Sequence, residues 1–231
     1  AFVWSQYDRS LSTITLPPRT AIDRHKRPRQ APLEEASRTE LAAIVPTTGP
    51  VLTKLAERGR KLFHAAGDTR LSADGRACAS CHPDGREDGL TWPSPKGLRQ
   101  TPMLAGRLRA DTAPFGWEGD AATIAVHVTG TIARLSGRGL SNDDMAALVA
   151  FLQQMAAPTP DPAPPSTNSL VARGATLFHS EVVGCAVCHK NAVGSDGSRH
   201  QVGSGAELGT PSLRFVAGTA PYFHDGRYAT L

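Results

Sequence analysis

The sequence predicts a mostly α-helical protein built from two similar modules in tandem, with a short β-hairpin at its N-terminus. The first observation is an internal repeat, in which Arg58–His64 is matched by Arg173–His179. The second is helical periodicity, because apolar residues recur at helical spacing in Leu52–Ala65 and again after Ser141. The third is composition: aromatic residues form 6% of the chain and glycine and proline are frequent, which suits small helical domains with long loops.

Five segments are expected along the chain. Residues 1–16 alternate around a polar centre, which is typical of a β-hairpin. Residues 17–50 are rich in proline and charge and are expected to form an extended, solvated linker. The two modules occupy residues 51–157 and 170–231, and the proline-rich residues 158–169 between them form a semi-rigid spacer.

Each module contains a C-x-x-C-H motif, at Cys78–His82 and at Cys185–His189. This spacing is the attachment signature of a c-type haem. The two thiols form thioethers with the porphyrin, and the histidine that follows ligates the iron. The sequence therefore predicts two covalent haems, held by Cys78, Cys81, His82, Cys185, Cys188 and His189, with His82 and His189 as the proximal iron ligands.

Other interpretations of the cysteines fit their spacing less well. A zinc ribbon places its second cysteine pair roughly 15–20 residues after the first, whereas these pairs lie about a hundred residues apart. A thioredoxin-like site needs a βαβ pattern beside its cysteine pair, and the sequence has none. Disulfides remain open for an exported chain, but they leave the histidine after each pair unexplained.

Charge and hydropathy restrict the partners. The net charge of +4 is small, and the basic cluster in residues 19–29 has no interleaved aromatic residues, so we expect no nucleic acid. No apolar run reaches the eighteen or so residues of a membrane span. Because c-type haem is attached outside the cytoplasmic membrane, we expect a periplasmic or exported protein. Its partner would be a redox protein or a small electron donor or acceptor, and the oligomeric state stays open.

The repeat extends beyond the haem motifs. Thr101–Leu104 matches Thr210–Leu213, and Thr112–Gly119 matches Thr219–Gly226. In these segments residues 51–231 resemble the bacterial dihaem cytochrome c peroxidase superfamily, which includes the MauG enzymes. The resemblance implies two cytochrome c-like haem domains in tandem.

The two domains are not expected to be equally complete. The second copy stops at Leu231, opposite Ile124 of the first, so the closing helix after Ser141 has no counterpart. We therefore expect the second domain to be truncated at its C-terminus. In cytochrome c folds the first and last helices of a domain cross at a glycine, and Gly59 against Phe151 is the expected contact. The N-terminal hairpin also resembles the closing strands of a β-propeller blade, and is a candidate remnant of one.

The resemblance assigns candidate roles to residues between the two haems. Trp117 matches a tryptophan that relays electrons between them; the alternative is an aromatic residue that packs at a domain interface. Thr219 and the carbonyl group of Pro221 match positions that help to bind calcium. The third calcium residue of the family is an asparagine, whereas this chain has Gln100. On this resemblance, calcium is a candidate second cofactor, with Gln100, Thr219 and Pro221 as its candidate residues.

The open face of the first haem carries a further candidate. The family's peroxidases have a glutamine there and, about ten residues later, a glutamate that moves protons. Here His127 lies near the first position, and no carboxylate occurs from Val126 to Asn142. Three roles stay open for His127: distal iron ligand, acid or base above an open iron, or ordinary helical residue.

The other candidate ligands are few. Met103 is a candidate iron ligand in its loop. The family's distal ligand of the second haem comes from a segment after Leu231, and His200 is a candidate substitute. The remaining candidates are expected to be structural: Met145, Met155, His64 and His179.

Two functions follow as hypotheses. In the first, the haems form one redox unit through Trp117 and the first haem oxidises substrates with peroxide, as a cytochrome c peroxidase-like oxidoreductase does. In the second, both irons are six-coordinate and the chain is an electron carrier for a partner or a catalytic domain. A redox or small-ligand sensor is a third hypothesis with less support. The sequence leaves catalysis undecided.

Overall fold

The structure is a computed structural model that describes residues 2–5, 10–15, 40–46, 51–158, 169–203 and 207–231. The chain divides into two compact units, Ala1–Val51 and Leu52–Leu231. The candidate functional residues all lie in the larger unit. The proline-rich spacer predicted for residues 158–169 falls mostly outside the described residues.

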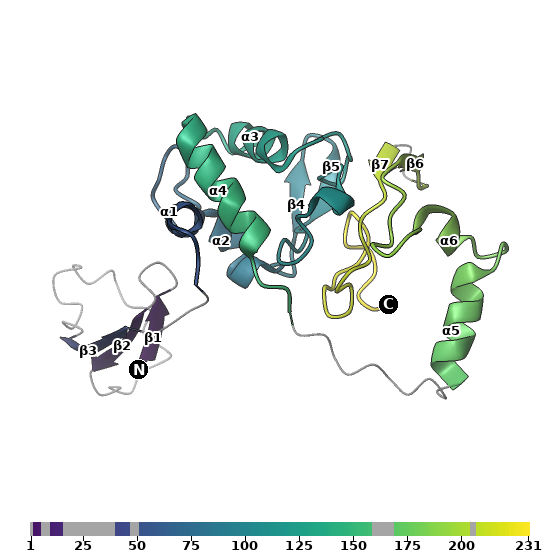
Figure 1. Cartoon of the computed structure of the whole chain (residues 1–231), viewed down its shortest axis with the longest axis horizontal. Coiled ribbons are helices and arrows are strands. Elements are labelled where there is room, and N and C mark those ends of the chain that lie inside the picture. Colours follow the sequence, from purple (N-terminus) through teal and green to yellow (C-terminus); the bar gives the residue numbers. More distant parts are fainter. Residues whose placement is uncertain (1, 6–9, 16–39, 47–50, 159–168, 204–206) are drawn as a thin grey trace, which may run out of the picture. The chain divides into compact units, whose positions relative to one another are not determined.

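The N-terminal unit contains a three-stranded antiparallel sheet, with strand order β1-β2-β3 (Figure 1). Strands β1 (Phe2–Ser5) and β2 (Ser10–Thr15) form the hairpin that was predicted for residues 1–16. Strand β3 (Glu40–Pro46) lies within residues 17–50, for which the sequence predicted only an extended linker. That prediction missed a short apolar run ending in Ile44 and Val45, which have high strand propensity and pair with β2. The rest of the predicted linker lies outside the described residues.

The larger unit is mostly helical, with small antiparallel hairpins. Its helices are α1 (Lys54–Phe63), α2 (Cys78–Cys81), α3 (Ile124–Arg134), α4 (Asn142–Gln154), α5 (Ser169–His179) and α6 (Cys185–Cys188). Its strands are β4 (Thr91–Ser94), paired with β5 (Gly97–Gln100), and β6 (Arg199–Gln201), paired with β7 (Glu207–Gly209). Two 3₁₀ turns cover Pro83–Gly85 and Ala110–Thr112. In the described part of the chain, no helix has the length and apolar character needed to cross a membrane.

Helix α4 starts at the predicted cap Ser141, whereas α1 starts at Lys54, two residues after the predicted start at Leu52. The Thr53 hydroxyl accepts a hydrogen bond from the Ala56 N–H at 3.2 Å, and the Ser141 hydroxyl accepts one from the Asp144 N–H at 3.2 Å. Both are N-caps, which satisfy backbone donors that the first helical turn leaves free. Asp143 and Asp144 follow in the first turn of α4, where negative charge is favourable.

The core of the first module lies where α1 packs across α4 (Figure 1). A Cβ built at Gly59 would overlap the carbonyl oxygen of Ala147 and lie 2.8 Å from Cβ of Phe151. Glycine is therefore required for this close approach, and the predicted contact is confirmed. Phe63 is fully buried beside it and meets Phe151 edge to face, with ring centroids 5.4 Å apart.

The second copy reproduces part of the first. The isolated β-bridge between Phe115 and Ala121 has a counterpart between Tyr222 and Tyr228, at matching positions of the repeat. Helix α5 corresponds to α1, but no residue of α5 is buried in the described part of the chain. Leu62 of α1 is 7% exposed, whereas its repeat counterpart Leu177 of α5 is 49% exposed. The two copies are thus alike in their loops and differ in how their first helices are covered.

Candidate haem and redox site

Both C-x-x-C-H motifs form single helical turns. The His82 N–H donates to the Cys78 carbonyl at 2.9 Å, and the His189 N–H donates to the Cys185 carbonyl at 3.0 Å. One turn therefore brings two thiols and the following imidazole to the same place, as haem attachment requires. All four cysteines are free thiols, so the disulfide alternative has no support in the structure.

The proximal imidazoles are oriented by backbone carbonyl groups. The His82 Nδ1 lies 3.3 Å from the carbonyl oxygen of Arg86, and the His189 Nδ1 lies 2.8 Å from that of Gly194. A carbonyl oxygen can only accept, so each Nδ1 carries the proton. Nε2 is then left with its lone pair, which is the atom and tautomer that an iron ligand needs.

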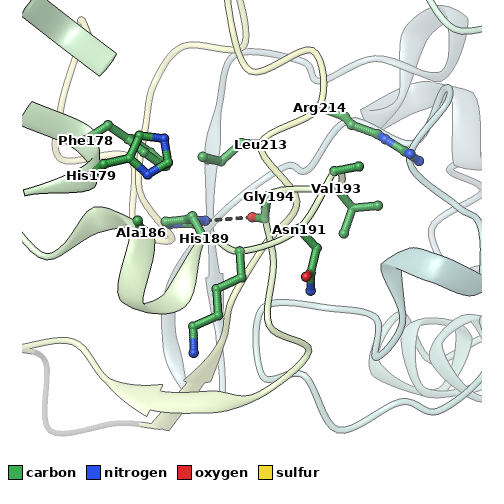
Figure 2. Close-up of a pocket in the computed structure, with 11 residues that line it drawn as sticks. Phe178, His179, Ala186, His189, Asn191, Val193, Gly194, Leu213 and Arg214 are labelled. Carbon is green, nitrogen blue, oxygen red and sulfur yellow. Dashed lines mark hydrogen bonds between the residues drawn. The ribbon is translucent and has the colours of Figure 1, made fainter. Parts of the chain in front are cut away.

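A cavity of about 550 Å³ opens beside the second motif (Figure 2). The figure shows His189 at its wall, with the imidazole turned toward Gly194, and Leu213 on the other side. Phe178, Ala186 and Val193 add apolar surface to the lining. A volume of this size and an apolar wall are typical of a cofactor site. Ala186 and His189 of the motif line the cavity and Cys185 and Cys188 flank them in the same turn, so the residues present fit a porphyrin attached at these cysteines.

Burial sets the protonation of the first motif. It lowers the pKa of His82 to about 4 and raises the pKa of the Cys78 thiol to about 11. The imidazole is therefore neutral at physiological pH, as iron ligation requires. These residues also fit a covalent haem.

His127 lies on α3 and is half-buried. Burial lowers its pKa, and a charge on His127 would in turn lower the pKa of His82, so the two imidazoles are close enough to interact. Its ring packs against the backbone of Gly116: a Cβ there would lie 2.8 Å from the His127 Cε1. The negative charges of Asp120 and Glu118 act in the opposite direction and raise the pKa of His127. Helix α3 itself carries no carboxylate, and the acids whose charges act on His127 come from the preceding loop.

Trp117 joins the two copies. Its Nε1 donates a hydrogen bond to the Gln100 carbonyl at 2.8 Å, and its own carbonyl accepts one from the Gly209 N–H at 2.9 Å. Its ring meets that of His224 edge to face, with centroids 6.4 Å apart. His224 is the repeat counterpart of Trp117, and it is 4% exposed. The indole therefore lies in the contact between the two modules.

The candidate calcium residues are partly brought together. The Gln100 Nε2 lies 3.5 Å from the Thr219 carbonyl oxygen, and the Gln100 N–H donates to the His224 carbonyl at 2.7 Å. The Thr219 hydroxyl donates to the Val216 carbonyl at 2.8 Å, while its own carbonyl accepts from the Gln100 amide. Pro221 follows two residues later and is half-buried. Rotation of the Gln100 amide would exchange its nitrogen for an oxygen facing Thr219.

The remaining candidates are placed as follows. Met103 is 2% exposed in its loop. His200 bonds through Nε2 to Asp196 Oδ2 at 2.8 Å, and both side chains lie near the Cys188 thiol. His64 binds the Arg60 carbonyl through Nδ1 at 2.8 Å, a structural role. Met155 packs against the core, Met145 is half-buried, and His179 lines the cavity beside His189.

The fold and the site agree with what the chain is similar to. Residues 56–156 match the cytochrome c family. The methylamine utilization protein MauG of Methylophilus methylotrophus is 26% identical over 278 aligned positions, which cover 93% of this chain and 76% of MauG. Residues 56–156 thus form a cytochrome c domain, in a chain that is similar to MauG over most of its length.

Two solved structures share the fold of this MauG-like chain. Hydrazine synthase of Kuenenia stuttgartiensis aligns with a TM-score of 0.64 at 20% identity, over 79% of this chain and 78% of its own. A MauG-like protein associated with microbial copper homeostasis aligns with a TM-score of 0.55 at 23% identity, over 81% and 74% respectively. The family and the MauG relative together identify c-type haem as the cofactor.

Three residues of the site were missed by sequence reasoning. Glu118 and Asp120 precede His127 in the chain, whereas the family's glutamate follows the corresponding position. His224 could have been found, because the repeat aligns it with Trp117. The first two become neighbours of His127 only because the Gly116 loop folds back onto α3.

Proposed function

We propose that this MauG-like cytochrome holds two covalent haems, at Cys78–His82 and Cys185–His189, and moves electrons between them. Trp117 is the proposed relay. The observation that carries the proposal is the position of its indole, hydrogen-bonded to Gln100 of the first module and packed on His224 of the second. An oxidisable ring at this contact divides one long electron-transfer step into two shorter ones.

At the first haem we propose peroxide-dependent oxidation. The bound haem supplies the iron centre at which peroxide is reduced. His127 is the acid/base residue: its neutral imidazole accepts a proton from the attacking peroxide oxygen and returns it to the leaving oxygen. Glu118 and Asp120 support this role, because their negative charges favour the protonated imidazole during the transfer. They stand in for the glutamate that the sequence lacks.

The second candidate is a pure electron carrier, in which His127 ligates the first iron. The electrostatic effect of His127 on the pKa of His82 favours the electron carrier. The two imidazoles come from different segments of the first module, and this effect requires them to lie near each other. Optical and EPR spectra of the ferric protein with and without hydrogen peroxide distinguish the two candidates. A high-spin haem that changes with peroxide supports the enzyme, and two low-spin haems that do not respond support the carrier.

Variants of His127 sharpen this test. In the enzyme, His127→Ala leaves the first haem high-spin and slows the reaction with peroxide by about 10²–10⁴-fold, the usual size of general acid–base catalysis. In the carrier, the same substitution converts a low-spin haem into a high-spin one. The mass of the intact chain must show two haem increments in either case, and a mass without them contradicts both candidates.

We further propose a periplasmic location, with a redox protein or a small molecule as electron donor, and a calcium ion held by Gln100, Thr219 and Pro221. The location is supported by the chemistry of haem attachment. The calcium site is supported by the proximity of Gln100 to the Thr219 carbonyl.

A further inference from the structure

Arg107 carries a buried nitrogen atom that takes no part in the function described so far. Its side chain is half-buried, and its Nε donates a hydrogen bond to the Arg214 carbonyl. Its Nη2 is buried and has no hydrogen-bond partner among the described residues. Burial lowers the pKa of Arg107 to about 10, so the guanidinium is still a cation at physiological pH. A buried cationic N–H without an acceptor is costly, and an anion bound at Nη2 would remove that cost.

The charges around Arg107 leave one positive charge unbalanced. Glu87 is the acid whose charge acts on Arg107, and its side chain is 7% exposed. Its Oε1 already accepts a hydrogen bond from Arg86 Nη2 at 3.2 Å, and its Oε2 has no partner among the described residues, so Oε2 does not bind Arg107 Nη2. Arg86 and Arg107 therefore carry two positive charges against one negative charge. One further carboxylate would neutralise the cluster, and a guanidinium binds a carboxylate with strong, charge-assisted hydrogen bonds.

Backbone hydrogen bonds hold Arg107 close to the first haem motif in the fold. The Arg107 N–H donates to the Leu104 carbonyl at 2.9 Å. The N–H groups of Leu104 and Ala105 donate to the Gly85 carbonyl at 2.8 and 2.9 Å. Gly85 lies three residues after His82, and its own N–H donates to the His82 carbonyl at 3.0 Å. The turn that contains Arg107 is thus bonded directly to the segment that follows the first motif.

Packing gives the same placement. Leu108, the residue after Arg107, packs against the core cluster of the first module, and so does Cys78 of the first motif. On the other side, Arg107 Nε reaches the carbonyl of Arg214 in the second copy. The guanidinium therefore lies beside the first motif, at the contact between the two copies.

Every haem carries two propionate carboxylates, which are anions of the kind that Arg107 lacks. On the basis of the haem proposed at Cys78–His82, we propose that Arg107 Nη2 binds a propionate of that first haem. A cation beside the propionate favours the reduced haem, which has one negative charge more than the oxidised haem. Arg107 therefore raises the reduction potential of the first haem as well as holding its propionate.

Spectroelectrochemical titration of the haem-loaded protein, followed at each haem's own absorption, tests this role. Arg107→Met keeps a long side chain and removes the cation. We expect the reduction equilibrium of the first haem to shift at least about tenfold toward the oxidised form, which is a potential about 59 mV lower for one electron. The second haem should change much less. Arg107→Lys restores the charge and should recover part of the shift.

Resonance Raman spectra give a readout of the contact itself, through the propionate bending mode. This mode should move in Arg107→Met and also in Arg107→Lys, because an ammonium group does not reproduce the hydrogen bond from Nη2. Where Arg107→Met does not fold, Arg107→Lys therefore still decides the question. A bending mode that is unchanged in Arg107→Lys would overturn the proposal.

Arg109→Met is the matched control. Arg109 lies two residues away, its side chain is 63% exposed, and it pairs with Asp111, so its removal should leave both potentials nearly unchanged. A shift confined to the second haem, or an equal shift of both haems in Arg107→Met, overturns the assignment of Arg107 to the first haem. A first haem that is attached but keeps its potential in Arg107→Met overturns the role of Arg107 alone. A chain without haem at Cys78 and Cys81 overturns the proposed function as well.

Discussion

Asp144 is a buried carboxylate of the first module that pairs with two arginines. Its Oδ1 lies 2.6 Å from Arg58 Nη2 and its Oδ2 lies 2.8 Å from Arg70 Nη1, and its side chain is 9% exposed. It also follows the Ser141 cap of α4. One carboxylate thereby ties α1, the loop after it and the start of α4 together.

Replacement of Asp144 by Asn should lower the free energy of unfolding by about 1–3 kcal/mol, because two guanidinium groups lose a charged acceptor. This loss of stability is at the low end for a buried ion pair, because both arginines are more than one-third exposed and their guanidinium groups stay partly hydrated. Denaturant unfolding of the haem-loaded protein measures it. An unchanged midpoint in Asp144→Asn would show that solvent replaces the carboxylate fully.

The same residue predicts a pH dependence. Burial raises the pKa of Asp144, but the hydrogen bond and charge of Arg58 outweigh it, so the pKa in the folded protein is below 3.8. A depressed pKa gives stability that is present above the unfolded-state value and is lost as the pH falls through the folded-state value. The difference in stability between the parent protein and Asp144→Asn should therefore shrink from pH 5 toward about pH 2. A difference that is constant over this range would contradict the assignment.

At the scale of secondary structure elements, the crossing of α1 and α4 depends on the absence of one side chain. The Gly59 Cα faces the Ala147 carbonyl with no room for a Cβ, and neighbouring backbone cannot give way as a flexible side chain can. Gly174 is the repeat counterpart of Gly59 in α5, and a Cβ there meets nothing within 4 Å. The chain thus contains a matched pair of helical glycines in opposite surroundings.

Gly59→Ala should destabilise the protein by about 1–3 kcal/mol through overpacking. Gly174→Ala should be neutral or stabilising by about 0.5–1 kcal/mol, because alanine has the higher helix propensity. Thermal unfolding of both variants measures the contrast. Equal effects of the two substitutions would mean that α1 and α4 do not approach as described.

At the scale of the whole larger unit, Trp117 and Gln100 lie where the two copies meet. Trp117→Phe keeps an aromatic ring but removes both the hydrogen bond to Gln100 and the more easily oxidised indole. We expect electron transfer between the haems to slow by at least about tenfold, with haem content unchanged. Stopped-flow reduction of the haem-loaded protein, followed at each haem's own absorption, measures the rate. A rate equal to that of the parent protein would remove Trp117 from the path.

Calcium should act on the same contact. Added calcium is expected to raise the unfolding temperature and a chelator to lower it again, because the ion would bind folded Gln100 and Thr219 and not the unfolded chain. Gln100→Leu should abolish this response, and Gln100→Asn, with the shorter amide of the family, should retain it. A chelator without effect on the parent protein would contradict the site.

The sequence by itself determined the haem chemistry and the helices that frame it. Two cysteines, a histidine and the turn that joins them lie within five residues, so their chemistry needs no distant contact. The cap at Ser141 and the small residue at Gly59 are local signals of the same kind. The repeat likewise predicts the matching loops that contain the bridges Phe115↔Ala121 and Tyr222↔Tyr228.

Only the tertiary structure decided what surrounds those motifs. The acids whose charges act on His127 and the imidazole beside Trp117 come from segments that loops bring together. Loop packing has no periodic signal in the sequence. Strand β3 also depends on a distant segment, because it is recognisable as a strand only through its pairing with β2. The chemistry of haem attachment depends on residues that are adjacent in the chain, so the sequence predicts it. The electrostatic environment of the haem ligands depends on residues that are distant in the chain, so only the tertiary structure gives it.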